Sequence, residues 1–223
     1  SSLVTGVQTC ALPISSTDIP PYFYIRGNRA VSEPNERIAS NYSTGWSRIQ
    51  GAFWRAGGIS PDLKLEDVLP RFTEEALRKI NSYDSSAGKP LFLYLAYPAP
   101  HTPWLPSAKY KGTGGAGMYG EFTAMVDGEI GRVLHALETR KLAGNTLVIF
   151  TSDNGPVWYD TDVKRFGHDS SGGLRGMKAD AWEGGHRMPF LLRWQGGVQA
   201  GSTTSHLVCF TDLLATFAEI VAS

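Results

Sequence analysis

Two apolar runs in this sequence lead to residues that could bind a metal ion or move a proton. TLVIFTSDNG ends with Asp153 and Asn154 ahead of Gly155, and LFLYLAYPAPHTPW contains His101 just beyond its apolar part. Carboxylate and amide oxygens suit calcium or magnesium better than zinc, although Asp-Asn-Gly is also a common turn sequence and a lone histidine can serve only for packing. Because open parallel sheets bind ligands at the carboxyl ends of their strands, we expect these residues to share one rim.

Lys178 is the third candidate, within the segment GGLRGMKADAWEGGHRMPFLLRW. Most lysines are solvated surface charges, but glycines, Trp182 and Met188 surround this one just ahead of an apolar run. We therefore expect its ammonium group to reach into a cleft. A cation, a histidine and a metal ion on one rim would suit chemistry on an anionic ester.

Two other patterns in the sequence do not point to a site. The five histidines have no spacing typical of a zinc site. GTGGAG, residues 112–117, matches a dinucleotide-binding pattern, but that pattern has meaning only between a strand and a helix. Here it follows the polar PSAKYK, so we predict a loop.

The elements that must position these residues follow from the apolar spacing. Helical spacing predicts helices over 71–83, with Thr73 as a candidate N-cap, over 119–142 and over 211–222. Continuous apolar runs predict buried strands within 88–97, 145–155 and 188–197. Residues 26–69 lack periodicity and are expected to form long loops. This order of elements predicts an α/β fold with a mixed, mostly parallel sheet sandwiched between helices.

The composition narrows the class of protein. The chain has 223 residues, with 21 basic and 21 acidic side chains and no block of like charge. This balance argues against a nucleic-acid partner and against a membrane surface as partner, and the apolar runs are too short to span a bilayer. Two cysteines are too few for a disulfide framework, and Cys209 is expected to be a small buried residue.

The first residues differ from the rest of the chain. VTGVQTCALPI, residues 4–14, resembles the translation of a common sequencing-library adapter. We therefore treat residues 1–15 as a non-native N-terminal artefact, which removes Cys10 from the list of candidate nucleophiles. We take residues 16–223 as a partial catalytic domain whose own N-terminal segment is expected to be missing.

Four blocks of the sequence resemble successive parts of the sulfatase family, of the arylsulfatase type. The blocks are PLFLYLAYPAPHTPWLPS, YGEFTAMVDGEIGRVL, NTLVIFTSDNG and LRGMKADAWEGGHRMPFLLRWQGGVQAG, in the family's order. The resemblance implies an alkaline-phosphatase-like fold, in agreement with the predicted elements. It also implies hydrolysis of sulfate esters.

The resemblance assigns a role to each candidate residue. Asp153 and Asn154 match the second pair of calcium ligands, with magnesium as the second choice of metal. His101 matches the histidine beside the ester oxygen, and Lys178 matches a lysine that binds the sulfate group. His168 lies in a stretch that often lines the pocket and is a candidate for substrate contact.

The departures from the family pattern concern the nucleophile. Sulfatases use a formylglycine, which a maturation enzyme makes from Cys or Ser in a C/S-x-P-x-R motif, and this sequence has no such motif. The first pair of aspartate ligands, a second sulfate-binding lysine and the C-terminal subdomain have no counterpart here either. We therefore expect the fragment alone to be inactive.

Two alternatives to the sulfatase interpretation remain open at this level. A phosphatase or phosphodiesterase of the same superfamily would bind transition metals, with a histidine where Asn154 stands. A non-catalytic binding protein could also keep the fold. The expected substrate is a sulfated small molecule or glycan, against which Trp46, Trp54 and Trp104 could stack, and the expected location is periplasmic, secreted or lysosome-like.

Overall fold

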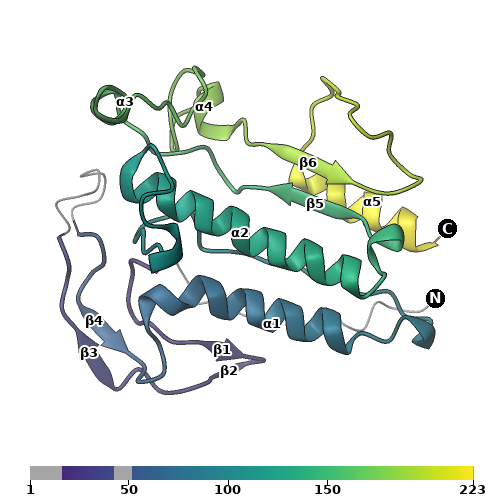
Figure 1. Ribbon diagram of the computed structural model, residues 1–223, viewed down its shortest axis with the longest axis horizontal. Coiled ribbons are helices and arrows are strands. Elements are labelled where there is room, and N and C mark those ends of the chain that lie inside the picture. Colours follow the sequence, from purple (N-terminus) through teal and green to yellow (C-terminus); the bar gives the residue numbers. More distant parts are fainter. Residues whose placement is uncertain (1–16, 43–51, 223) are drawn as a thin grey trace.

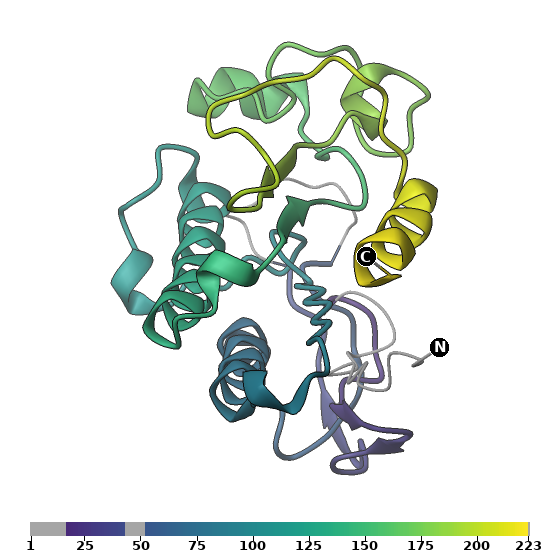
Figure 2. The same cartoon turned by 90° about the vertical axis from the view of Figure 1, so that its right-hand side faces the viewer.

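The computed structural model describes residues 17–42 and 52–222, so the predictions for Cys10 and Trp46 lie outside the described residues. Two long helices, α1 (Val68–Ser82) and α2 (Gly117–Thr139), run side by side on one side of the molecule. Strands β5 (Val148–Thr151) and β6 (Phe190–Arg193) lie in the middle, and α5 (Phe210–Ala222) covers the other side (Figures 1 and 2). The layers are therefore helix, strand and helix, as the sequence predicted.

Helix α1 forms where helical spacing predicted it, but it begins earlier. A 3₁₀ turn, η1 (Leu65–Asp67), leads directly into it, and Pro70 is tolerated because the first turn has no intrahelical bond to lose. Thr73 is not an N-cap. Its side chain is fully buried inside the helix, where Oγ1 contacts the Leu69 carbonyl at 3.3 Å and the Tyr97 hydroxyl at 2.7 Å.

Helix α2 buries a stripe of residues against the core. The buried members are Phe122, Met125, Val126, Glu129, Ala136 and Leu137. The GTGGAG segment is a loop, as predicted, between the 3₁₀ turn η3 (Ala108–Tyr110) and the start of α2. Three further short turns and helices connect the elements: η2 (Ser85–Ala87), η4 (Ala143–Asn145) and α3 (Asp160–Phe166).

The strand pairing differs from the expectation of mostly parallel strands. β5 pairs with β6 in antiparallel register, with Val148 opposite Arg193 and Thr151 opposite Phe190. Within 26–69, where loops were expected, β1 (Ile25–Arg26) pairs with β2 (Arg29–Ala30) and β3 (Glu36–Ile38) with β4 (Gly57–Ile59), both antiparallel. The paired strands of the described residues are therefore antiparallel, and an isolated bridge between Tyr22 and Ile59 is parallel.

The strand expected within 88–97 is not formed. These residues carry no ladder hydrogen bonds, although Phe92 packs edge-on against Phe217 of α5 at 5.6 Å. An apolar run predicts burial, whereas a strand also needs a neighbouring backbone in register. The prediction of a buried strand was therefore wrong about the pairing and about the burial, since no residue of 88–97 is buried and Tyr94 is 65% exposed.

Three apolar clusters hold the described residues together. One joins α1 and α2 to the loops that carry Trp104 and Trp158, a second joins α1 to Tyr22 and Tyr24, and a third joins Ile80 of α1 to the last turns of α2. Cys209 lies outside all three, because it is exposed and free rather than buried. In the part of the chain that the structure describes, no helix has the length and apolar character to cross a bilayer.

Candidate active site

Strand β5 delivers Asp153 and Asn154 at its carboxyl end. Ser152 Oγ donates to Asp153 Oδ1 at 3.4 Å and to the Asn154 carbonyl at 3.1 Å, which shapes the turn. Asn154 Nδ2 donates to the Gly155 carbonyl at 2.9 Å, so its Oδ1 is the amide atom that can act as a ligand. Asp153 is exposed and Asn154 is half-buried.

Gly155 brings this turn into backbone contact with α4 (Glu183–His186). Its N–H donates to the Gly185 carbonyl at 2.9 Å. A Cβ at Gly155 would lie 1.9 Å from the Gly184 carbonyl oxygen. Only glycine permits so close an approach of two backbones.

Lys178 lies beside the same turn. Its N–H donates to the Pro156 carbonyl at 2.8 Å, two residues beyond Asn154. Ala179 follows with φ of 76°, an unusual conformation for a residue with a Cβ. The Lys178 side chain is half-buried, and its ammonium group makes no ion pair with the described residues.

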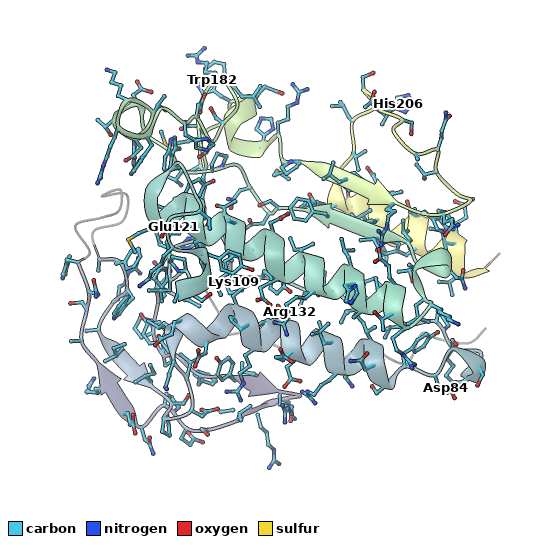
Figure 3. The ribbon with its side chains drawn as sticks, in the orientation of Figure 1. Asp84, Lys109, Glu121, Arg132, Trp182 and His206 are labelled. Carbon is cyan, nitrogen blue, oxygen red and sulfur yellow. The ribbon has the colours of Figure 1, made fainter. Side chains whose placement is uncertain are left out.

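The loop of Lys178 is held by a compact set of backbone contacts. The Gly184 N–H donates to the Arg175 carbonyl, and Asp180 Oδ2 accepts from the Met177 N–H at 3.0 Å. The Arg175 guanidinium also stacks 3.4 Å above the Trp182 ring, which projects from the end of the molecule that carries α4 (Figure 3). This loop is therefore a fixed part of the site.

His101 lies in the proline-rich loop after residues 88–97. Its Nδ1 is 2.8 Å from the Thr102 carbonyl oxygen and 3.9 Å from Asp18 Oδ1. The loop is anchored by Trp104, whose Nε1 donates to the Pro100 carbonyl at 2.9 Å. The side chain of His101 is 27% exposed, so it is accessible from solvent.

An aromatic cluster joins the His101 loop to the Asp153 turn. Trp104 lies 6.5 Å from Trp158, which follows the turn directly. Trp158 Nε1 in turn donates to the His168 carbonyl at 2.7 Å, and the His168 ring lies 5.9 Å from Trp158. A backbone hydrogen bond thus ties Lys178 to Pro156 in the segment after Asp153, and the side chains of Trp104 and Trp158 connect the loops of His101 and His168 to this segment.

Trp104 and Trp54 are not free to stack on a sugar. Trp104 is 4% exposed and belongs to the core. Trp54 Nε1 donates to the Ala39 carbonyl at 3.0 Å, and its ring packs against Phe53 at 5.8 Å. Both rings pack in the apolar core.

The sequence reasoning missed Asp18 and Arg55, which lie behind His101. Asp18 is buried, and its Oδ2 is 3.8 Å from Arg55 Nη2. The only local signal was an aspartate close to the segment PPYFY, which packs into the core through Tyr22 and Tyr24.

The donor set fits part of a calcium site. No group of three or more His, Cys, Asp or Glu residues within 17–42 and 52–222 is placed to hold a metal ion. Asp153 and Asn154 offer oxygen atoms, the donor type that calcium and magnesium prefer. Because calcium takes about six to eight oxygens, these two residues would supply only a share of its shell.

The turn after β5 carries two oxygen-donor side chains and is hydrogen-bonded to the backbone of Lys178, which is compatible with an enzyme that acts on an anionic ester. A sequence model of the sulfatase family matches residues 32–222, and the chain belongs to this family. The fold is accordingly a partial alkaline-phosphatase-like domain of mixed helices and strands.

Individual proteins that are similar in sequence to this chain are also named sulfatases. The chain is 34% identical over 173 residues to an N-acetylgalactosamine-6-O-sulfatase of Bacteroides thetaiotaomicron, covering 75% of this chain and 33% of that protein. It is 36% identical over 171 residues to the N-acetylgalactosamine-6-sulfatase of Sus scrofa, covering 77% of this chain and 32% of that protein. The chain thus spans about a third of the length of these curated relatives.

Solved structures show the same similarity in three dimensions. A structure described under the metabolism of multiple glycosaminoglycans by Bacteroides thetaiotaomicron superposes with a TM-score of 0.75 at 27% identity, covering 93% of this chain and 49% of that one. Ps i-CgsB in complex with k-i-k-neocarrahexaose superposes with a TM-score of 0.57 at 30% identity, covering 75% of this chain and 37% of that one.

Proposed function

We propose that the chain is part of the catalytic domain of an enzyme that hydrolyses sulfate esters. The observation that carries the proposal is the hydrogen bond from the Lys178 N–H to the Pro156 carbonyl at 2.8 Å. This bond ties the backbone of Lys178 to the turn that carries Asp153 and Asn154 at the end of β5, which supports a position of its ammonium group near these two side chains. Positive charge and hard oxygen ligands on one rim are the features that a sulfate group requires.

Each residue would have a distinct task. Lys178 binds the sulfate oxygens and stabilises negative charge as the S–O bond breaks. His101 acts at the ester oxygen that leaves, to which its ring can donate a proton. His168 contacts the substrate from the exposed side of the aromatic cluster.

Asp153 and Asn154 would hold calcium, together with ligands that the described residues do not supply. When bound, calcium would orient the nucleophile and neutralise sulfate charge. The nucleophile would be a formylglycine, installed by a maturation enzyme in a C/S-x-P-x-R motif that this sequence does not contain. We therefore propose that residues 16–223 alone have no turnover.

The proposed substrate class is a sulfated glycan. Two of the relatives above are named for N-acetylgalactosamine sulfate, and the structural neighbours are described with glycosaminoglycans and a carrageenan oligosaccharide. Such polymers are found outside the cytoplasm, so we propose that the full-length protein acts in the periplasm, in a secreted form or in a lysosome-like compartment.

A pair of substitutions in the full-length enzyme tests these roles. Lys178→Ala should lower kcat for an aryl sulfate about 100-fold and leave calcium affinity unchanged. Asp153→Ala should weaken calcium binding first, and excess calcium should restore part of its activity. Lys164→Ala, which changes an exposed lysine on α3, is the matched control and should leave both quantities unchanged.

Three results would contradict the proposal. Rescue of Lys178→Ala by calcium would exchange the two assigned roles. Faster turnover of an aryl phosphate than of the aryl sulfate would favour a phosphatase. Absence of turnover with either ester in the mature full-length protein would favour a non-catalytic binding protein.

A further inference from the structure

A buried carboxylate faces His101 from a part of the chain that the proposed reaction does not use. Asp18 is 1% exposed, and its Oδ1 lies 3.9 Å from His101 Nδ1. Its other oxygen, Oδ2, lies 3.8 Å from Arg55 Nη2. Burial of a carboxylate is costly unless opposite charges compensate it, so Asp18 is expected to have a specific role.

The backbone holds Asp18 in place independently of its side chain. The Asp18 carbonyl accepts a hydrogen bond from the Arg55 N–H at 3.0 Å. The hydroxyl of Tyr22, itself 1% exposed, donates to the Arg55 carbonyl at 2.9 Å. These contacts hold the Asp18 backbone in the position from which Oδ1 lies 3.9 Å from His101 Nδ1.

The surroundings of His101 favour a proton on one ring nitrogen. Nδ1 lies 2.8 Å from the carbonyl oxygen of Thr102, which can only accept a hydrogen bond and so favours a proton on Nδ1. The Thr102 hydroxyl, 3.4 Å from Nδ1, can accept from it or donate to it, so this contact favours neither tautomer. The Asp18 carboxylate lies on the same side of the ring, and this leaves Nε2 as the nitrogen available to an ester oxygen.

We propose that Asp18 is a positioning residue for His101, whose carboxylate favours the Nδ1–H tautomer and so leaves Nε2 free to act on the substrate. This inference rests on the proposed role of His101 at the ester oxygen. A carboxylate behind an imidazole performs the same task in hydrolase triads, where it sets tautomer and orientation. At 3.8 and 3.9 Å, the contacts of Asp18 with Arg55 and His101 are electrostatic rather than direct hydrogen bonds.

The tautomer of His101 can be measured in the 223-residue chain itself. Long-range ¹H–¹⁵N correlation spectra of the histidine-labelled chain report which ring nitrogen is protonated, and His101→Gln assigns the signals. The wild-type chain should show the Nδ1–H form. In Asp18→Asn the population of this form should fall by about half or more, because the negative charge that favours it is gone.

Asp62→Asn is the matched control, because it also neutralises a carboxylate that faces an arginine. Asp62 Oδ2 lies 3.3 Å from Arg71 Nη1, and this substitution should leave the His101 signals unchanged. A folded Asp18→Asn chain with the wild-type tautomer would overturn the proposal. Restoration of the Nδ1–H form by Asp18→Glu would support it.

A second measurement covers the case in which Asp18→Asn does not fold. In the wild-type chain the same spectra should show the Nδ1–H form of His101, and a spectrum dominated by the Nε2–H form would overturn the proposal. Neither readout needs sulfate ester turnover. A failed activity assay would therefore leave this inference standing, and a failed tautomer measurement would leave the proposed function standing.

Discussion

Gly155 is the residue on which the geometry of the candidate site most directly depends. It follows Asp153 and Asn154, the two candidate metal ligands. It also approaches the backbone of α4 so closely that a Cβ would lie 1.9 Å from the Gly184 carbonyl oxygen. The space for a side chain is closed by backbone, which cannot rotate away as a flexible side chain could. The position of Asp153 and Asn154 relative to Lys178 therefore relies on the absence of one carbon atom.

Gly155→Ala should destabilise the chain, and Gly131→Ala should not. The first substitution forces two backbone segments apart and should lower the free energy of unfolding by about 1–3 kcal/mol. Gly131 is an exposed glycine within α2, and a Cβ added there would meet nothing within 4 Å, so alanine there should raise stability by about 0.5–1 kcal/mol. Urea unfolding of both variants measures the difference. Equal effects of the two would contradict the close approach at Gly155.

At the scale of elements, α1 and α2 are joined by a charged contact as well as by apolar packing. Arg132 on α2 pairs with Glu129 on the same helix at 2.8 Å and with Glu74 on α1. Figure 3 shows Arg132 between the two helices. The hydrogen bond to Glu74, and to a smaller degree that to Glu129, raises the pKa of Arg132. Glu129 is 6% exposed, and Arg132 supplies the opposite charge that offsets the burial of its carboxylate.

Arg132→Ala should lower the free energy of unfolding because it leaves the buried Glu129 carboxylate without its cation. The loss should be about 1–2 kcal/mol, below the value for a fully buried pair because the Arg132 side chain is 41% exposed. Glu138→Gln is the control. It removes an exposed pair with Arg193 at 3.7 Å and should change stability by less than about 0.5 kcal/mol. Unfolding in urea at neutral pH separates the two, and an Arg132→Ala chain of wild-type stability would disprove the role of this contact.

At the scale of the whole molecule, two buried tyrosines make stability depend on alkaline pH. Burial raises the pKa of Tyr22 and of Tyr24 to about 12, and the guanidinium of Arg71, 3.9 Å above the Tyr24 ring, opposes this rise only in part. In the unfolded chain a tyrosine ionises near about 10. In the folded state the hydroxyls of Tyr22 and Tyr24 therefore keep their protons to a higher pH than in the unfolded chain. Their contribution to the free energy of unfolding is complete below pH 10 and is lost as the pH rises toward about 12.

Tyr24→Phe should make the fall in the free energy of unfolding at alkaline pH smaller. The variant removes one of the tyrosines whose ionisation favours unfolding, so its free energy of unfolding should fall less between about pH 10 and pH 12 than that of the wild type. Tyr42→Phe, at a side chain that is 69% exposed, should follow the wild-type curve. Urea unfolding at a series of pH values tests both, and an equally steep loss in Tyr24→Phe would show that its ionisation is not linked to unfolding.

Local patterns in the sequence were sufficient for several features. Helical spacing predicted α1 and α2, because a buried stripe repeats with the helix period regardless of what covers it. The apolar run before Asp153 predicted strand β5, with the candidate ligands Asp153 and Asn154 just beyond its end. This could be predicted because the strand and both residues lie within a few consecutive positions of the sequence. The colinear blocks indicated the sulfatase family, which the match over residues 32–222 confirmed.

Only the tertiary structure decided which distant segments meet. Apolar spacing reports whether a residue is buried, but not which backbone lies beside it, so the antiparallel pairing of β5 with β6 and the interior position of Thr73 were not predictable. The contact of Lys178 with Pro156 and the placement of Asp18 behind His101 depend on packing that brings separate parts of the chain together. Pairings of this kind arise from the fit of the whole fold, and no local pattern of residues encodes them.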